Sequence, residues 1–152
     1  MKKLKLLLIM LLCGVSASAD IWTDEYRQVE QSIEQPSFAD RTFNITRYGA
    51  KPGADAKKNQ KAINKAIAAC TKAGGGKVVI PAGTFETGAI TLLDNVNLVV
   101  EEGATLLFAF RPELYPVVPT RWEGLDCWNL SPCIYAKDAR NVAITGKGTI
   151  DG

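Results

Sequence analysis

Residues 43–106 constrain the fold more than any other part of this chain. They place a strand-like lead, one amphipathic helix, a run of three glycines and a row of short strands in that order. The lead, residues 43–46, alternates apolar and polar side chains, which is typical of a half-buried strand. Few folds need this order of elements, so the block predicts a specific architecture.

The helix is predicted by apolar residues at positions i, i+3, i+4 and i+7, namely Ile63, Ala66, Ile67 and Cys70. The residues expected to face away from the core are Lys57, Lys58, Lys61, Asn64, Lys65 and Lys72. Asp55 stands where an N-cap is useful, and glycines 74–76 end the helix because glycine adopts the left-handed conformation without steric cost. Cys70 is interpreted as a small buried hydrophobe.

The segment after Lys77 has a sequence pattern that is typical of many short strands. The predicted strands are residues 78–80, 84–87, 89–92, 96–100 and 104–108. Glycine, proline, asparagine or aspartate separates most of them, which indicates tight turns.

A weak internal repeat predicts how these strands assemble. Residues 95–98 read Asn-Val-x-aliphatic and are followed by Gly and Thr-aliphatic, and residues 141–150 repeat this pattern. We interpret the offset as about two coils of a solenoid with ~20–25 residues per coil. The repeat favours an all-β fold, a parallel β-helix, over a sandwich. The amphipathic helix would then cover the open first coil, whose strand edges and apolar core are otherwise exposed.

An excursion, residues 111–132, separates the two copies of the repeat. It is rich in proline and aromatic residues and is predicted to be an irregular loop that leaves the solenoid and returns near residues 133–136. Such loops line binding clefts on rigid scaffolds. Cys127 and Cys133 lie at its end and are candidates for a loop disulfide in an oxidising compartment.

The first 19 residues are predicted to be a signal peptide. Three lysines precede an apolar run at residues 6–12, and Ala17-Ser18-Ala19 offers small residues before cleavage at Asp20. The apolar run is too short to span a bilayer, which needs roughly 20 residues. The protein is therefore expected to be exported, to the periplasm or the medium.

The charge balance and the absence of histidine exclude some partners and one kind of metal site. The chain has 18 Lys and Arg against 16 Asp and Glu, and loss of the three signal-peptide lysines leaves 15 basic residues. Without a basic patch, nucleic acid is not an expected partner. The absence of histidine excludes a mixed Cys/His zinc site, and neither a metal nor another cofactor is predicted.

The mature chain divides into two expected parts. Residues 20–42 are a polar segment in which Trp22, Tyr26, Val29 and Ile33 share one helical face. Residues 43–152 form the cap and first coils of a larger domain. We expect this domain to be incomplete at its C-terminus, because the chain stops soon after a strand with no closing element.

Several motifs resemble the polygalacturonase-type glycoside hydrolases of family 28, in the pectin-lyase-like superfamily. The motifs are YGA at 48–50, GGGKV at 74–78, PAGTF at 81–85, EGATL at 102–106, TRWEG at 120–124 and GKGTIDG at 146–152. The resemblance covers residues 43–152 and implies a right-handed parallel β-helix with an N-terminal capping helix. One departure, residues 53–58, lacks the Asp-Gly turn common in the family.

The resemblance implies inverting hydrolysis of α-1,4-linked galacturonan, with two carboxyl groups roughly 6.5–9.5 Å apart. The family supplies them from Asn-Thr-Asp and Asp-Asp motifs, supported by Gly-His-Gly and Arg-x-Lys, and none of these occurs here. No catalytic residue is therefore assigned. Asp126, Asp138 and Asp151 are interpreted as loop or turn residues. The 152-residue chain alone is expected to be inactive and poorly soluble.

The expected partner is a pectic polysaccharide or oligogalacturonide, bound by a monomer. Arg121 and Trp122 are the candidate substrate-binding residues, because arginine pairs with carboxylates and tryptophan packs on sugar rings. Three alternatives stay open at this point. They are a pectate-lyase-like enzyme, a non-catalytic glycan-binding or structural β-helix, and a hydrolase for another pectic polymer.

Overall fold

The computed structural model of the protein describes residues 20–152, with side chains described from residue 25. The predicted signal peptide, residues 1–19, lies outside the described residues. The chain divides after Gln35 into two compact units. Among the described residues, no helix combines the length and apolarity that crossing a membrane requires.

The first unit contains one described helix, α2 (Asp20–Ser32). It confirms the helix predicted from the spacing of apolar residues in this segment. Tyr26 and Val29, which the spacing places on one face, are exposed.

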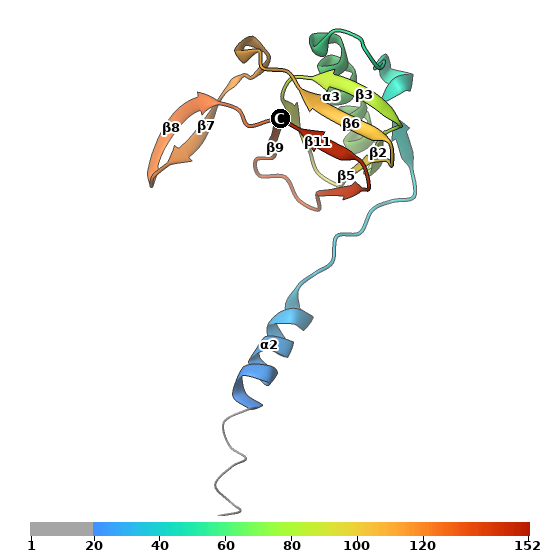
Figure 1. The fold of residues 1–152 in the computed structure, drawn as a ribbon. Helices are drawn as coiled ribbons and strands as arrows, with labels where there is room; N and C mark the ends of the chain where they lie inside the picture. The colour runs from blue at the N-terminus through green and yellow to red at the C-terminus, as the bar shows by residue number, and fades with distance from the viewer. Residues whose placement is uncertain (1–19) are drawn as a thin grey trace, which may run out of the picture. The chain divides into compact units, whose positions relative to one another are not determined.

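Three parallel sheets form the framework of the second unit, residues 36–152 (Figure 1). The first sheet has the order β1 (Thr42–Asn44), β2 (Gly76–Ile80), β5 (Val96–Val100) and β10 (Ala143–Gly146). The second has the order β3 (Gly83–Thr87), β6 (Ala104–Phe108) and β11 (Thr149–Asp151). The third pairs β4 (Ile90–Thr91) with β9 (Ile134–Tyr135). The chain visits the sheets in turn and lays each new strand parallel to the previous one, which confirms the strand-rich, parallel architecture.

The two copies of the sequence repeat stack directly on each other. Ile144 of β10 pairs with Leu98 of β5, and Ile150 of β11 pairs with Leu106 of β6. The interpretation of the offset as about two coils is therefore wrong, since the copies lie on neighbouring strands of the same sheets. The excursion between them lengthens a single turn of the chain, which explains the long spacing.

The core lies between the sheets and is filled by their inward-facing side chains. Val78, Leu98, Phe85 and Leu106 are fully buried, and the last two are partners in the β3–β6 register. Stacking like residues at equivalent positions buries apolar surface from one turn to the next, at about 25 cal/mol per Å².

Helix α3 (Ala56–Lys72) packs against strands of all three sheets with the face predicted from the sequence. Ile63, Ala66, Ile67 and Cys70 are all buried. Asp55 caps the helix, because its Oδ1 accepts from the backbone N–H of Lys57 at 3.0 Å.

One polar residue of α3 departs from the prediction. Asn64 was expected to face away from the core but is half-buried. Its Nδ2 donates to the carbonyl of Ala89 at 3.3 Å, and its Oδ1 accepts from the N–H of Thr91 at 2.9 Å. The helix therefore binds β4 through a polar side chain at the edge of its apolar face.

The predicted lead strand is shorter than expected. β1 ends at Asn44, and a 3₁₀ helix (Ile45–Tyr48) follows. Asn44 causes this change of direction locally, because its Oδ1 accepts from the N–H of Thr46 at 3.0 Å and caps the 3₁₀ turn.

The excursion is ordered, so the prediction of an irregular loop is wrong. A short 3₁₀ helix (Pro112–Leu114) leads into an antiparallel hairpin of β7 (Val117–Trp122) and β8 (Leu125–Leu130). Glu123 and Gly124 form its two-residue turn with φ of 48° and 88°, as the twist of a tight hairpin requires. The chain then returns to the framework at β9, close to the predicted point.

Candidate functional site

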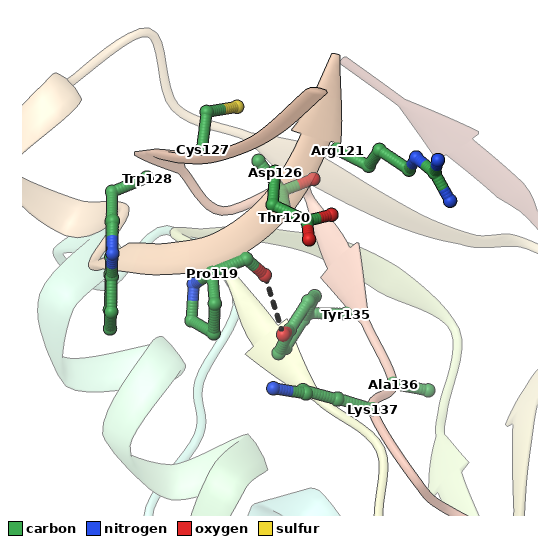
Figure 2. Close-up of a pocket in the computed structure, with 9 residues that line it drawn as sticks. All are labelled: Pro119, Thr120, Arg121, Asp126, Cys127, Trp128, Tyr135, Ala136 and Lys137. Atoms are coloured by element: carbon green, nitrogen blue, oxygen red, sulfur yellow. Dashed lines mark hydrogen bonds between the residues drawn. The ribbon is translucent and has the colours of Figure 1, made fainter. Parts of the chain in front are cut away.

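A groove of about 590 Å³ lies between the β7–β8 hairpin and the segment that contains β9 (Figure 2). Its lining residues are Pro119, Thr120, Arg121, Asp126, Cys127, Trp128, Tyr135, Ala136 and Lys137. The volume is within the range of small-ligand sites, ~300–1,000 Å³.

The hairpin presents different side chains on its two faces. Cross-strand partners lie on the same face, so Pro119 and Trp128 form one pair, and Arg121 and Asp126 form the next pair on that face. Trp122 lies one residue along and therefore on the opposite face. There it lines a second hollow of about 330 Å³ with Leu125, Cys127 and Asn129. The structure thus separates the two predicted substrate-binding residues, and only Arg121 lines the larger groove.

Arg121 is held in place by its own turn. Its Nε and Nη2 donate to the carbonyl oxygen of Gly124 at 3.1 and 3.0 Å. Within the described residues, Arg121 takes part in no ion pair, although Asp126 is its cross-strand partner. The side chain is exposed, and its remaining N–H groups are available to a ligand.

Tyr135 connects the hairpin to the parallel framework. It belongs to β9, and its Oη donates to the carbonyl oxygen of Pro119 at 3.4 Å (Figure 2). Lys137 follows two residues later and is exposed at the same groove. The groove therefore has one wall on the hairpin and one wall on the stack of sheets.

The lining combines an aromatic platform with a positive charge excess. Trp128 is 72% exposed, although tryptophan is usually well buried. Arg121 and Lys137 supply two positive charges against the single negative charge of Asp126. This chemistry suits an acidic ligand with an apolar ring face. It does not provide a pair of carboxyl groups for acid–base cleavage.

The structure does not join the two cysteines predicted to pair. Cys127 and Cys133 are both free and half-buried. Cys127 is on β8, whereas Cys133 lines a separate apolar groove of about 280 Å³ with Tyr115 and Gly152. Burial, together with the neighbouring Cys133, raises the pKa of the Tyr115 phenol. The disulfide stays a prediction for the oxidised protein.

The three aspartates weighed as catalytic candidates are dispersed. Asp138, with a left-handed φ of 55° after β9, fits the interpretation as a turn residue. That interpretation is wrong for Asp126, which lies in β8 and lines the groove, and for Asp151, which is exposed in β11. Within residues 25–152, no three His, Cys, Asp or Glu side chains are grouped to hold a metal ion.

The chain is similar in sequence and in structure to several polygalacturonases. The chain is 36% identical over 120 residues to an exo-poly-α-D-galacturonosidase of Dickeya chrysanthemi. Its structure matches a hyperthermoactive exopolygalacturonase of Thermotoga maritima with a TM-score of 0.75 and 39% identity over 83% of the chain. It also matches the family 28 exopolygalacturonase of Yersinia enterocolitica with a TM-score of 0.63 and 33% identity over 75% of the chain.

The chain is homologous to the N-terminal part of polygalacturonases. This confirms the resemblance found in the sequence. The homologous region is 74% of this chain but only 19% of the Dickeya enzyme, and 28% and 21% of the Thermotoga and Yersinia structures. No protein-family model matches the chain.

Sequence reasoning missed three residues of the groove, namely Trp128, Tyr135 and Lys137. Trp128 lies between the two cysteines, and alternation along β8 places it on the face of Arg121 once the hairpin is recognised. Tyr135 and Lys137 come from the returning segment. Only the pairing of β9 with β4 brings them opposite the hairpin.

Proposed function

We propose that this chain forms part of a glycoside hydrolase that cleaves polygalacturonan. The observation that carries the proposal is its homology to three polygalacturonases at 33–39% identity, in sequence and in structure. No specific observation on this chain favours a lyase or a non-catalytic binding protein.

The chemistry proposed is inverting hydrolysis, in which one carboxyl group protonates the leaving oxygen and another activates water. The described residues contribute a scaffold and a groove to this reaction. The carboxyl groups themselves are proposed to come from segments that correspond to the parts of the relatives this chain does not match.

The scaffold is proposed to be a right-handed parallel β-helix that α3 caps at its N-terminal end. The parallel stacking of β2, β5 and β10 supports the helical path of the chain. The buried face of α3 against the first strands supports the capping role, because an uncovered first coil exposes apolar core to water.

The protein is further proposed to be exported as a monomer after cleavage before Asp20. N-terminal sequencing of the protein from the periplasm or medium checks the cleavage site, and sedimentation checks the mass. A retained N-terminus at Met1, or a dimer, contradicts this part of the proposal.

The test of the main proposal is an activity assay on the protein expressed at the full length of its gene. Release of reducing ends from polygalacturonate is expected, without the absorbance of unsaturated products. Carboxyl-reduced polygalacturonate is the matched control substrate. Absence of cleavage, or cleavage with unsaturated products, contradicts the proposal.

A further inference from the structure

We infer that the groove between β8 and β9 binds one uronate residue of an acidic glycan, with Trp128 beneath the sugar ring and Lys137 at its carboxylate. The identity of the sugar as galacturonate rests on the proposed function. The location of the site and its preference for an acidic ring rest on the groove itself.

Trp128 supplies the platform. Its indole is 72% exposed and lies on the groove face of the hairpin, beside Pro119 and away from Cys127, whose sulfur points to the other side (Figure 2). A sugar ring has an apolar face of C–H groups, and covering an exposed indole with it removes apolar surface from water. Trp122 offers a similar ring on the opposite face, but no cation lines the hollow there.

Lys137 and Arg121 supply the charge. Both line the groove, and within the described residues neither belongs to an ion pair. Arg121 keeps N–H donors beyond the two that bind Gly124. A bound carboxylate would offset the positive excess that Asp126 alone does not balance.

One hydrogen bond links the two walls of the groove. Tyr135 lies in β9, which pairs with β4 in the framework, and its Oη holds the hairpin through the carbonyl of Pro119. A link between the walls reduces the conformational freedom that the site must lose on binding, which favours affinity.

The experiment measures binding of thio-linked trigalacturonate, which a hydrolase does not cleave, by calorimetry on the protein expressed at the full length of its gene. The corresponding neutral thio-linked galactose trisaccharide is the second ligand. The variants are Trp128→Ala and Lys137→Gln in the groove, and Trp122→Ala on the opposite face of the hairpin. Their matched controls are Leu125→Ala, on the other face of the same strand and 74% exposed, and Lys147→Gln, an exposed lysine outside the groove.

We expect Trp128→Ala to weaken binding of both ligands by about tenfold, since an aromatic contact contributes on this order. Lys137→Gln is expected to weaken only the acidic ligand, by about fivefold at low salt, and to reduce the salt dependence of its Kd. Both controls should keep the wild-type Kd, and thermal melting should show that all variants fold.

Three results overturn the inference. One is wild-type affinity in both groove variants, another is an equal loss for acidic and neutral ligands in Lys137→Gln, and the third is a loss in Trp122→Ala without one in Trp128→Ala. Cleavage of polygalacturonate by the same wild-type protein is measured separately. If the groove variants alter binding but the wild type does not cleave, the proposed function fails and the binding site stands.

Discussion

The side-chain amide of Asn141 donates to the side-chain oxygen of Asn95 at 2.9 Å across neighbouring turns of the framework. Both residues have left-handed backbone, with φ of 53° and 61°, and precede paired strands. Asn141 also donates to the carbonyl of Ser37 at 2.7 Å and accepts from its N–H at 3.1 Å. One side chain therefore ties the start of the second unit to its last described turn.

Replacing Asn141 separates its two contributions. Asn141→Gly loses the three hydrogen bonds, but glycine adopts the positive φ without strain. We therefore expect a loss of about 2 kcal/mol in the free energy of unfolding. Asn141→Ala adds strain at positive φ, about 1 kcal/mol more. Urea denaturation of the full-length gene product measures both, and equal losses in the two variants contradict the account.

Gly146 tests how closely β10 approaches β5. A Cβ at this position would overlap the carbonyl oxygen of Val100. We expect Gly146→Ala to disrupt the pairing and lower the midpoint of thermal unfolding by several degrees, since both strain and a backbone clash are introduced. Gly124→Ala is the matched control, because Gly124 also has positive φ but nothing lies within 4 Å of its Cβ. A larger effect at Gly124 would refute this reading of the packing.

Asn59 is fully buried and joins two backbone segments, the loop at Lys51 and strand β3, to α3. Its Oδ1 accepts from the N–H of Lys51 at 2.9 Å, and its Nδ2 donates to the carbonyls of Lys51 at 3.1 Å and Glu86 at 3.0 Å. Asn59→Ala leaves these groups unpaired away from water and is expected to cost about 3 kcal/mol in unfolding free energy. Lys61→Ala, on the exposed side of the same helix, should change it by less than about 0.5 kcal/mol.

The ion pairs around Arg111 predict a dependence of stability on pH. Arg111 Nη1 lies 3.0 Å from Asp55 Oδ2, and its Nε lies 2.8 Å from Glu113 Oε1. The hydrogen bond from Arg111 lowers the pKa of Asp55 and also that of Glu113. A carboxyl group with a lowered folded-state pKa stabilises the protein above its unfolded pKa, and this stabilisation is lost as the pH falls through the folded value.

We therefore expect the thermal midpoint to fall on acidification below about pH 4. Arg111→Gln should make this fall shallower, because the carboxyl groups then titrate near their ordinary values. Asp55→Asn keeps the helix cap and removes one titrating group, so it should flatten the profile without a large loss at neutral pH. If the thermal midpoint of both variants falls with acidification as steeply as that of the wild type, these ion pairs do not contribute to the pH dependence of stability.

The sequence predicted the elements whose signal is local and periodic. The spacing of Ile63 and Cys70 predicted the buried face of α3, and Asp55 predicted the position of its N-cap. The repeated Asn-Val motif predicted stacked strands, and its two asparagines, Asn95 and Asn141, do lie side by side. Homology to polygalacturonases confirms the family resemblance that the motifs carried.

Other features depended on contacts far along the chain. The burial of Asn59 is not visible in a periodic pattern, because its partners are backbone groups of the loop at Lys51 and of strand β3. The hairpin was missed because proline and aromatic residues obscured its alternation, and the number of turns between the repeats was miscounted as a result. Trp128 and Lys137 meet at one groove only through the pairing of β9 with the framework.

The most direct test of the central claim is the mass of the products formed from polygalacturonate in water enriched in ¹⁸O by the protein expressed at the full length of its gene. Hydrolysis predicts saturated galacturonate products that carry one ¹⁸O per bond cleaved, because water supplies the new hydroxyl group. Unsaturated products without ¹⁸O, or intact polymer after prolonged incubation, would contradict the assignment of this chain to a glycoside hydrolase.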